Sequence, residues 1–136
     1  LSGSTNRIGF IKNTQVFINE CVQDLIINNA YLKLADVFLS GNNVERFFIV
    51  SVFQETKSKL KCISSGQELV DRFLNVAYST DSSALGLVFD LFTILAEYIC
   101  NDKRIHHIIL KALVQPVSEE LVHVIKTAKS LSMKSV

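Results

Sequence analysis

The sequence contains 136 residues, of which 49% are hydrophobic and 20% are charged, and its formal net charge is +1. This composition supplies enough apolar surface for a folded core and excludes a disordered, highly charged chain. The near-neutral charge also excludes a strong overall field toward nucleic acid or membranes, and a single proline with five glycines favours helices with short connections over a β-sandwich of many turns.

The three cysteines, Cys21, Cys62 and Cys100, are widely spaced and form no Cys-x-x-Cys pair. An odd number at such spacing argues against a disulfide framework and favours a reducing compartment, either the cytosol or the nucleus. The first six residues lack the basic and apolar regions of a signal peptide. Since the chain starts at Leu1 and not at a methionine, we expect an excised fragment or a processed chain.

The N-terminal half predicts one helix and then two helices joined by a short turn. Isoleucines in residues 6–19 follow a near-helical spacing, although Gly9 weakens this prediction, and the apolar residues of 25–39 lie on one helix face. We expect Gly41 to end that helix in a left-handed conformation and Asn43 to cap the next one. Two helices joined by a three-residue turn must run back beside each other.

The segment that follows Asn43 allows two interpretations. Residues Phe47 to Phe53 are aromatic and β-branched enough to form a buried strand. No turn signal precedes Ser64-Ser65-Gly66, however, and the resulting length of the segment favours a helix.

Further helices are predicted in the C-terminal half. Residues 69–77 form an amphipathic stripe, Asp102 is expected to cap the helix that carries the apolar face of 105–113, and Pro116 with Ser118 marks the start of the last helix. These signals indicate short helices with short connections.

The most apolar run of the chain, residues 85–100, follows an expected helix cap at Asp81. Asp90, Thr93 and Glu97 interrupt the run, and it is shorter than the roughly 20 residues of a membrane span. It therefore predicts one buried helix and no membrane association.

The expected helix starts recur at a regular interval. The caps expected at Asn6, Asn43, Asp81 and Ser118 are separated by 37, 38 and 37 residues, and each period holds two helices. A two-helix unit of about 40 residues is typical of HEAT and armadillo arrays. We therefore predict an all-α fold, a right-handed α-solenoid of HEAT/armadillo-type helix pairs with about six or seven helices.

On this interpretation residues 1–136 are a single helical-repeat segment, a fragment of a longer α-solenoid. An ordinary globule of about six or seven helices, whose helix spacing only looks periodic, stays open as the alternative.

One stretch carries a family resemblance. Residues 27–38 read Ile-Asn-Asn-Ala-Tyr-Leu-Lys-Leu-Ala-Asp-Val-Phe, and Gly41-Asn42-Asn43 and then Arg46 follow them. This stretch resembles the N-terminal repeat region of the Integrator complex subunit 7 family. The sequence LKLADVF with GNN at that spacing is more specific than a general helical pattern.

The resemblance covers most of the chain from about Ile8 onward but is uneven. The run from Arg104 to His107 falls where the family has a basic residue and two histidines. The chain departs from the family at Ser82 and Leu85, where the family has a proline and a basic residue, and the last helix matches in pattern more than in residues.

The resemblance implies a role for the chain as well as a fold. The family is a nuclear, non-catalytic scaffold of the Integrator assembly, which binds RNA polymerase II, forms small nuclear RNA 3′ ends and attenuates transcription. Cleavage and phosphatase activity belong to other subunits, so the resemblance carries over no catalytic residue and no cofactor. The implied partners are other Integrator subunits, bound through protein–protein contacts in the nucleus.

The sequence contains residue types that can form metal and catalytic sites. Cys100, His106, His107 and His123 have metal-ligand chemistry, but zinc requires four ligands in paired short spacings and these residues lack them. No serine or cysteine carries a local catalytic signature, and the isolated glycines form no phosphate-binding loop. We therefore predict no enzyme activity, no metal, no cofactor and no small-molecule substrate.

The remaining candidate is a basic helix face that would contact phosphate or an acidic partner. Its residues are Lys103, Arg104, His107, Lys111, Lys126 and Lys129. Glu119 and Glu120 lie nearby in the sequence and no aromatic residue is interleaved for base stacking, so a solvated helix face is favoured. The alternative function is a helical-repeat adaptor that binds nucleic acid or an acidic partner through this face.

Overall fold

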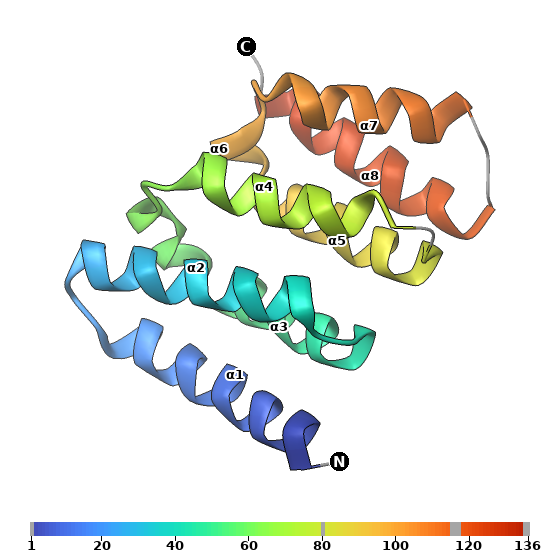
Figure 1. Cartoon of the computed structure of the whole chain (residues 1–136). Coiled ribbons are helices and arrows are strands. Elements are labelled where there is room, and N and C mark those ends of the chain that lie inside the picture. Colours follow the sequence, from blue (N-terminus) through green and yellow to red (C-terminus); the bar gives the residue numbers. More distant parts are fainter. Residues whose placement is uncertain (1, 80, 115–117, 135–136) are drawn as a thin grey trace. The chain divides into compact units, whose positions relative to one another are not determined.

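The computed structural model describes residues 2–79, 81–114 and 118–134, and within these ranges every regular element is a helix (Figure 1). The predicted all-α fold is thereby confirmed, and the segment Phe47 to Phe53 is helical rather than a strand. The chain forms two compact units, Leu1–Asn75 and Val76–Val136. No helix in the described ranges combines the length and the apolar character that crossing a bilayer requires.

The first unit consists of three long helices followed by two shorter ones. They are α1 (Ser2–Glu20), α2 (Asp24–Ser40), α3 (Asn43–Glu55), the 3₁₀ helix η1 (Lys57–Cys62) and α4 (Gly66–Ala77), whose last two residues are counted with the second unit. Both α1 and α2 pack on α3, and η1 packs on α2. This arrangement of packed helix pairs is that of a helical-repeat fold.

Buried aromatic rings hold α2, α3 and α4 together. Tyr31 and Phe53 have ring centroids 4.9 Å apart, and Phe73 lies edge-on to Phe38 at 5.3 Å and to Phe53 at 6.0 Å. All four side chains are completely buried. Pairs of this geometry stabilise a core by about 0.5–1.5 kcal/mol each beyond their burial.

The turn between α2 and α3 differs in two details from the prediction. The N-cap of α3 is Asn42 and not Asn43: its side chain accepts from the Glu45 N–H at 2.9 Å while Glu45 Oε1 accepts from the Asn42 N–H at 2.9 Å. Gly41 has φ −87° and ψ −176°, so the left-handed conformation predicted for it was wrong. A reciprocal capping box needs its acidic residue at the third helical position, and only Asn42 places Glu45 there.

Arg46 of α3 also stabilises the turn between α2 and α3. Its Nε donates to the Phe38 carbonyl at 2.8 Å, its Nη1 donates to Asn43 Oδ1 at 3.0 Å, and the guanidinium lies 5.6 Å from the centroid of the Phe38 ring. A cation that binds the last carbonyls of a helix also complements the helix dipole. The predicted hairpin is therefore held by side chains from both of its helices.

The second unit contains α5 (Ser82–Ile94), α6 (Ala96–Ile99), α7 (Lys103–Val114) and α8 (Ser118–Lys134). Helices α5, α6 and α7 all pack against α8. Asp81 caps α5 as predicted, since its carboxylate accepts from the Ser83 and Ala84 N–H groups at 3.0 and 3.2 Å. Asn6, by contrast, lies inside α1 and caps nothing, because the helix continues back to Ser2.

The described ranges hold eight α-helices and one 3₁₀ helix, more than the six or seven expected. One extra element is η1, and the other arises because the run 85–100 breaks at Leu95 into α5 and α6. The Thr93 hydroxyl bonds the Phe89 carbonyl at 2.9 Å, a backward bond that bends helices. Ser118 is the first helical residue of α8 and not the N-cap that was expected there, and Pro116 lies outside the described residues.

Candidate functional site

Asp102 sets the start of α7, the helix that carries most of the predicted basic face. Its Oδ1 accepts from the Arg104 N–H at 2.9 Å, and its Oδ2 lies 3.0 Å from Arg104 Nη2. Burial by itself would raise the pKa of Asp102, but the hydrogen bonds and the charge of Arg104 outweigh it and hold that pKa below its usual value. The predicted cap is confirmed, and its charge is stabilised at neutral pH.

A row of polar contacts fixes α8 against α5. His123 Nδ1 lies 2.8 Å from Asp90 Oδ1, and the Thr127 hydroxyl lies 2.8 Å from the Phe89 carbonyl and 2.8 Å from the Thr93 hydroxyl. Thr127 is completely buried. These contacts favour the observed rotation of α8 on α5, because they give the buried Thr127 hydroxyl partners on both helices.

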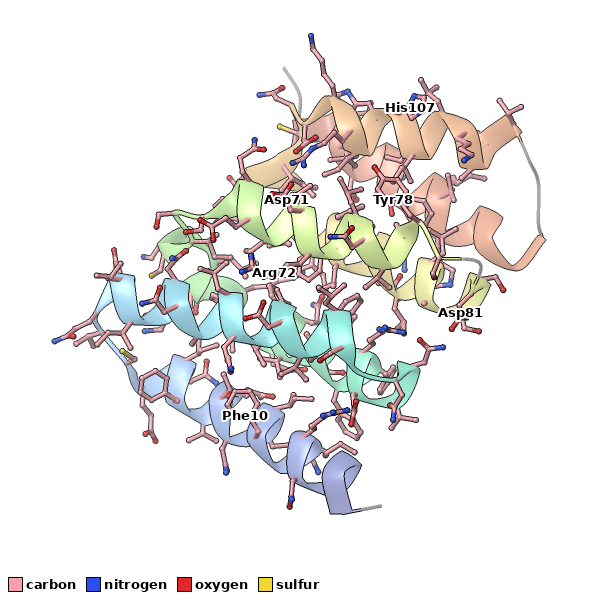
Figure 2. All side chains as sticks on the ribbon, viewed as in Figure 1. Phe10, Asp71, Arg72, Tyr78, Asp81 and His107 are labelled. Atoms are coloured by element: carbon pink, nitrogen blue, oxygen red, sulfur yellow. The ribbon has the colours of Figure 1, made fainter. Side chains whose placement is uncertain are left out.

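Helix α7 presents three of the candidate residues on one exposed face. Lys103, His107 and Lys111 are each four residues apart and exposed, while Ile105, Ile108 and Ile109 are buried on the other side of the helix. Figure 2 shows His107 on this face of α7. Arg104 is half-buried and engaged with Asp102, so its charge is partly neutralised within the helix.

The other two candidates, Lys126 and Lys129, are exposed on α8. Helical spacing puts them on the side of α8 away from the buried residues Val124, Thr127 and Leu131. Neither lysine forms an ion pair with another residue in the described part of the chain. That the two helices contribute to one continuous basic strip stays a prediction.

The residues weighed as metal ligands make other contacts. Cys100 is buried at the end of α6 with its Sγ 3.7 Å from the Lys134 carbonyl, His106 Nε2 lies within hydrogen-bond distance of the Cys100 carbonyl, and His123 pairs with Asp90. Across residues 2–79, 81–114 and 118–134, no three His, Cys, Asp or Glu side chains come together as a metal site. Each of these three side chains contributes to packing between or at the ends of helices.

Sequence reasoning did not identify a hollow between α1 and α2. We call it the α1–α2 groove and define it by its lining residues Phe10, Asn13, Thr14, Phe17, Ala30 and Lys33. The signal for it was present in the spacing of Phe10 and Phe17, which are seven residues apart and therefore share one side of a helix. The residues of α2 that lie opposite these two rings are set by the packing of the two helices. The spacing of residues along the sequence does not reveal that packing.

Comparison with known proteins identifies relatives over most of the chain. The family model described as "Integrator complex subunit 7, N-terminal" matches residues 10–136. Integrator complex subunit 7 of Homo sapiens is 33% identical over 111 residues, which is 82% of this chain and 12% of the human protein. The protein of the same name from Danio rerio is 34% identical over the same shares.

A more distant relative is also similar. The Integrator complex subunit 7 homolog of Dictyostelium discoideum is 31% identical over 83 residues, covering 61% of this chain and 8% of that protein. The chain thus spans about 12% of the length of the vertebrate relatives that it matches.

Proposed function

This chain belongs to the Integrator complex subunit 7 family, and from that premise we propose that it is a non-catalytic scaffold segment of the Integrator complex. The observation that carries the proposal is the family match over residues 10–136. The function is then exerted in the nucleus, where the complex associates with RNA polymerase II, processes small nuclear RNA 3′ ends and attenuates transcription. The binding partners are other Integrator subunits.

The proposed mechanism is geometric. A scaffold must hold its outer surfaces in fixed positions, and helical repeats do so because each helix packs only on its neighbours. Within the first unit Arg46 ties α3 to the last carbonyls of α2, and within the second unit Thr127 ties α8 to α5. These buried or half-buried contacts make each unit a rigid platform, with partner contacts left to the exposed faces.

The proposal is tested by affinity purification of the tagged chain from nuclear extract, followed by mass spectrometry. We expect Integrator subunits to be enriched over a control pull-down with an unrelated helical-repeat fragment of similar size. Circular dichroism must first show that the purified chain is helical and unfolds cooperatively. A folded chain that recovers no Integrator subunit would contradict the proposed role.

The second candidate function is binding of nucleic acid through the basic face. It is favoured by the exposure of Lys103, Lys111, Lys126 and Lys129 without an ion pair to any described residue. The formal net charge of +1 counts against it.

This candidate predicts a steep salt dependence. Each lysine that contacts a phosphate releases a counterion, so its replacement by glutamine should lower the slope of log K against log salt by about 1. The Lys57→Gln variant, whose lysine is exposed in the other unit, is the control and should leave the slope unchanged. Binding that is absent, or insensitive to salt, would exclude this candidate.

A further inference from the structure

The α1–α2 groove is a surface hollow of about 330 Å³ with almost entirely apolar walls. Phe10 and Phe17 form one wall and Ala30 lies on the opposite helix; Figure 2 shows Phe10 where α1 runs beside α2. The volume is at the small end of ligand pockets, which measure about 300–1,000 Å³. It therefore has room for one or two large side chains, which a docked helix can insert while its own backbone stays outside the hollow.

The aromatic wall is exposed although the same helix has a buried face. Phe10 is 38% exposed and Phe17 is 46% exposed, whereas Ile11 and Ile18, the next residue in each case, are completely buried. The second apolar side of α1 is thus not needed for the core of the first unit. The two rings therefore leave an apolar hollow that is open to solvent.

The apolar surface continues along α2. Ile26 is 40% exposed and precedes Ala30 by four residues and Lys33 by seven, so the three side chains share one side of the helix. Because α1 and α2 run antiparallel, Lys33 lies toward the Phe10 end of the groove. The positive charge of the lining is therefore placed at one end of the groove.

Lys33 is the charged residue in the lining, and it is exposed. It forms no ion pair or hydrogen bond with the described residues. Two other lysines of the first unit do have partners: Lys59 Nζ donates to the Cys21 carbonyl at 2.8 Å, and Lys12 Nζ lies 5.3 Å from the centroid of the Phe48 ring. An ammonium group beside an apolar hollow is complementary to a carboxylate carried next to a large apolar side chain.

We propose that the α1–α2 groove binds an amphipathic helix of a partner protein. This helix inserts an aromatic or long aliphatic side chain between Phe10 and Phe17 and places a carboxylate beside the Lys33 ammonium. A groove between two antiparallel helices is straight, and a docked helix supplies anchors at the spacing i, i+3, i+4 and i+7 that such grooves accept. The proposal does not depend on membership of the Integrator complex, because it rests on the geometry of the groove alone.

The test is selection of helix-forming peptides from a display library against the whole 136-residue chain. We expect the selected peptides to carry an aromatic or aliphatic anchor with an acidic residue one helical turn away. Fluorescence anisotropy of a labelled selected peptide then measures affinity. Phe17→Ala should weaken binding by about 10-fold or more, as loss of an interface anchor does, and Lys33→Glu by about 5- to 10-fold.

Charge reversal separates this proposal from non-specific hydrophobic binding. Against Lys33→Glu, the library should yield peptides with lysine or arginine where the first selection gave aspartate or glutamate. Lys61→Glu is the matched control, since Lys61 is exposed in η1 and outside the groove, and it should select the same peptides as the unmodified chain. Both positions are exposed, so neither change is expected to unfold the chain.

Three results would overturn the proposal. One is the absence of any enriched peptide, and another is selected peptides whose affinity is unchanged by Phe17→Ala and Lys33→Glu. The third is self-association of the chain in sedimentation experiments that Phe17→Glu abolishes, because a second copy of the chain would then be the occupant.

Discussion

The side chain of Asn28 in α2 holds the backbone of Ser65, immediately before α4. Asn28 Oδ1 accepts from the Ser65 N–H at 3.1 Å and from the Ser64 N–H at 2.9 Å, and Asn28 Nδ2 donates to Ser65 Oγ at 3.1 Å. Asn28 is only 2% exposed. A single asparagine thus supplies the hydrogen bonds that the connection between η1 and α4 cannot make with itself.

Replacement of Asn28 should therefore be costly. We expect Asn28→Ala to lower the free energy of unfolding by about 2–3 kcal/mol, because it leaves the N–H groups of Ser64 and Ser65 without their partner. Urea denaturation followed by circular dichroism measures the change. Asn29→Ala makes the same substitution at the next, exposed position of α2 and should change stability by about 0.5 kcal/mol or less. Equal effects of the two changes would contradict this role for Asn28.

Gly41 is required for space and not for a left-handed conformation. A Cβ at this position would lie 2.6 Å from Glu45 Oε1 and 2.7 Å from the Val37 carbonyl, the latter being backbone of α2 that cannot move freely. We expect Gly41→Ala to lower the free energy of unfolding by about 1–2 kcal/mol through overpacking.

The control for Gly41 is Gly9, which lies within α1 at a position where a Cβ would meet no atom of another part of the chain within 4 Å. Gly9→Ala should stabilise the chain, by up to about 1 kcal/mol, because alanine has the higher helix propensity. Thermal unfolding of both variants tests the pair of predictions. A stabilising Gly41→Ala would show that the turn can open without penalty.

The contribution of Asp102 should depend on pH in a defined direction. Its folded pKa is lower than its value in the unfolded chain, about 3.9. The stability that its charge supplies is therefore fully present above that pH and is lost as the pH falls through the folded pKa. We expect Asp102→Ala to lower the free energy of unfolding by about 1 kcal/mol at pH 7, as loss of a helix cap does.

Asp102→Asn isolates the effect of the charge. Urea denaturation of this variant and of the unmodified chain, from neutral to acid pH, measures the difference between their free energies of unfolding. The other carboxylates are the same in both chains, so their contributions to the pH dependence cancel in this difference. The difference should shrink toward low pH. A difference that stays constant would show that the charge of Asp102 has no part in its role.

Local signals were enough to predict much of the fold. Asp81 and Asp102 cap their helices as expected, since an aspartate cap acts on N–H groups two or three residues away. The hairpin of α2 and α3 was also predicted, although its cap lies one residue earlier, at Asn42. These features depend on neighbours in the sequence, and such neighbours are visible without a structure.

The features that could not be predicted depend on distant residues. The contact of the Thr127 hydroxyl with the Phe89 carbonyl of α5 joins residues that are 38 positions apart in the sequence. The lining of the α1–α2 groove needs the register of two helices, so the spacing of Phe10 and Phe17 alone did not indicate a hollow. The exposure of Lys103 and Lys111, by contrast, follows from helical spacing and was predicted.

The hydroxyl of Thr127 lies between α5 and α8. Its Oγ1 is 2.8 Å from the Phe89 carbonyl, 2.8 Å from the Thr93 hydroxyl and 2.8 Å from the His123 carbonyl of its own helix. One hydroxyl group donates only one hydrogen bond at a time. The Thr93 hydroxyl, which also lies 2.9 Å from the Phe89 carbonyl, can therefore donate to that carbonyl when Thr127 donates elsewhere. Thr127→Val keeps the shape of the side chain but removes this shared donor and acceptor.

We expect Thr127→Val to lower the free energy of unfolding by about 1–2 kcal/mol, because the change leaves buried polar groups of α5 with fewer partners. The matched control is Ser132→Ala, which removes a hydroxyl from an exposed position of the same helix and should have almost no effect. The double variant Thr93→Val with Thr127→Val completes a cycle in urea denaturation. If the two hydroxyls act as one network, the double change should cost less than the sum of the two single changes, whereas strict additivity would show that each hydroxyl acts alone.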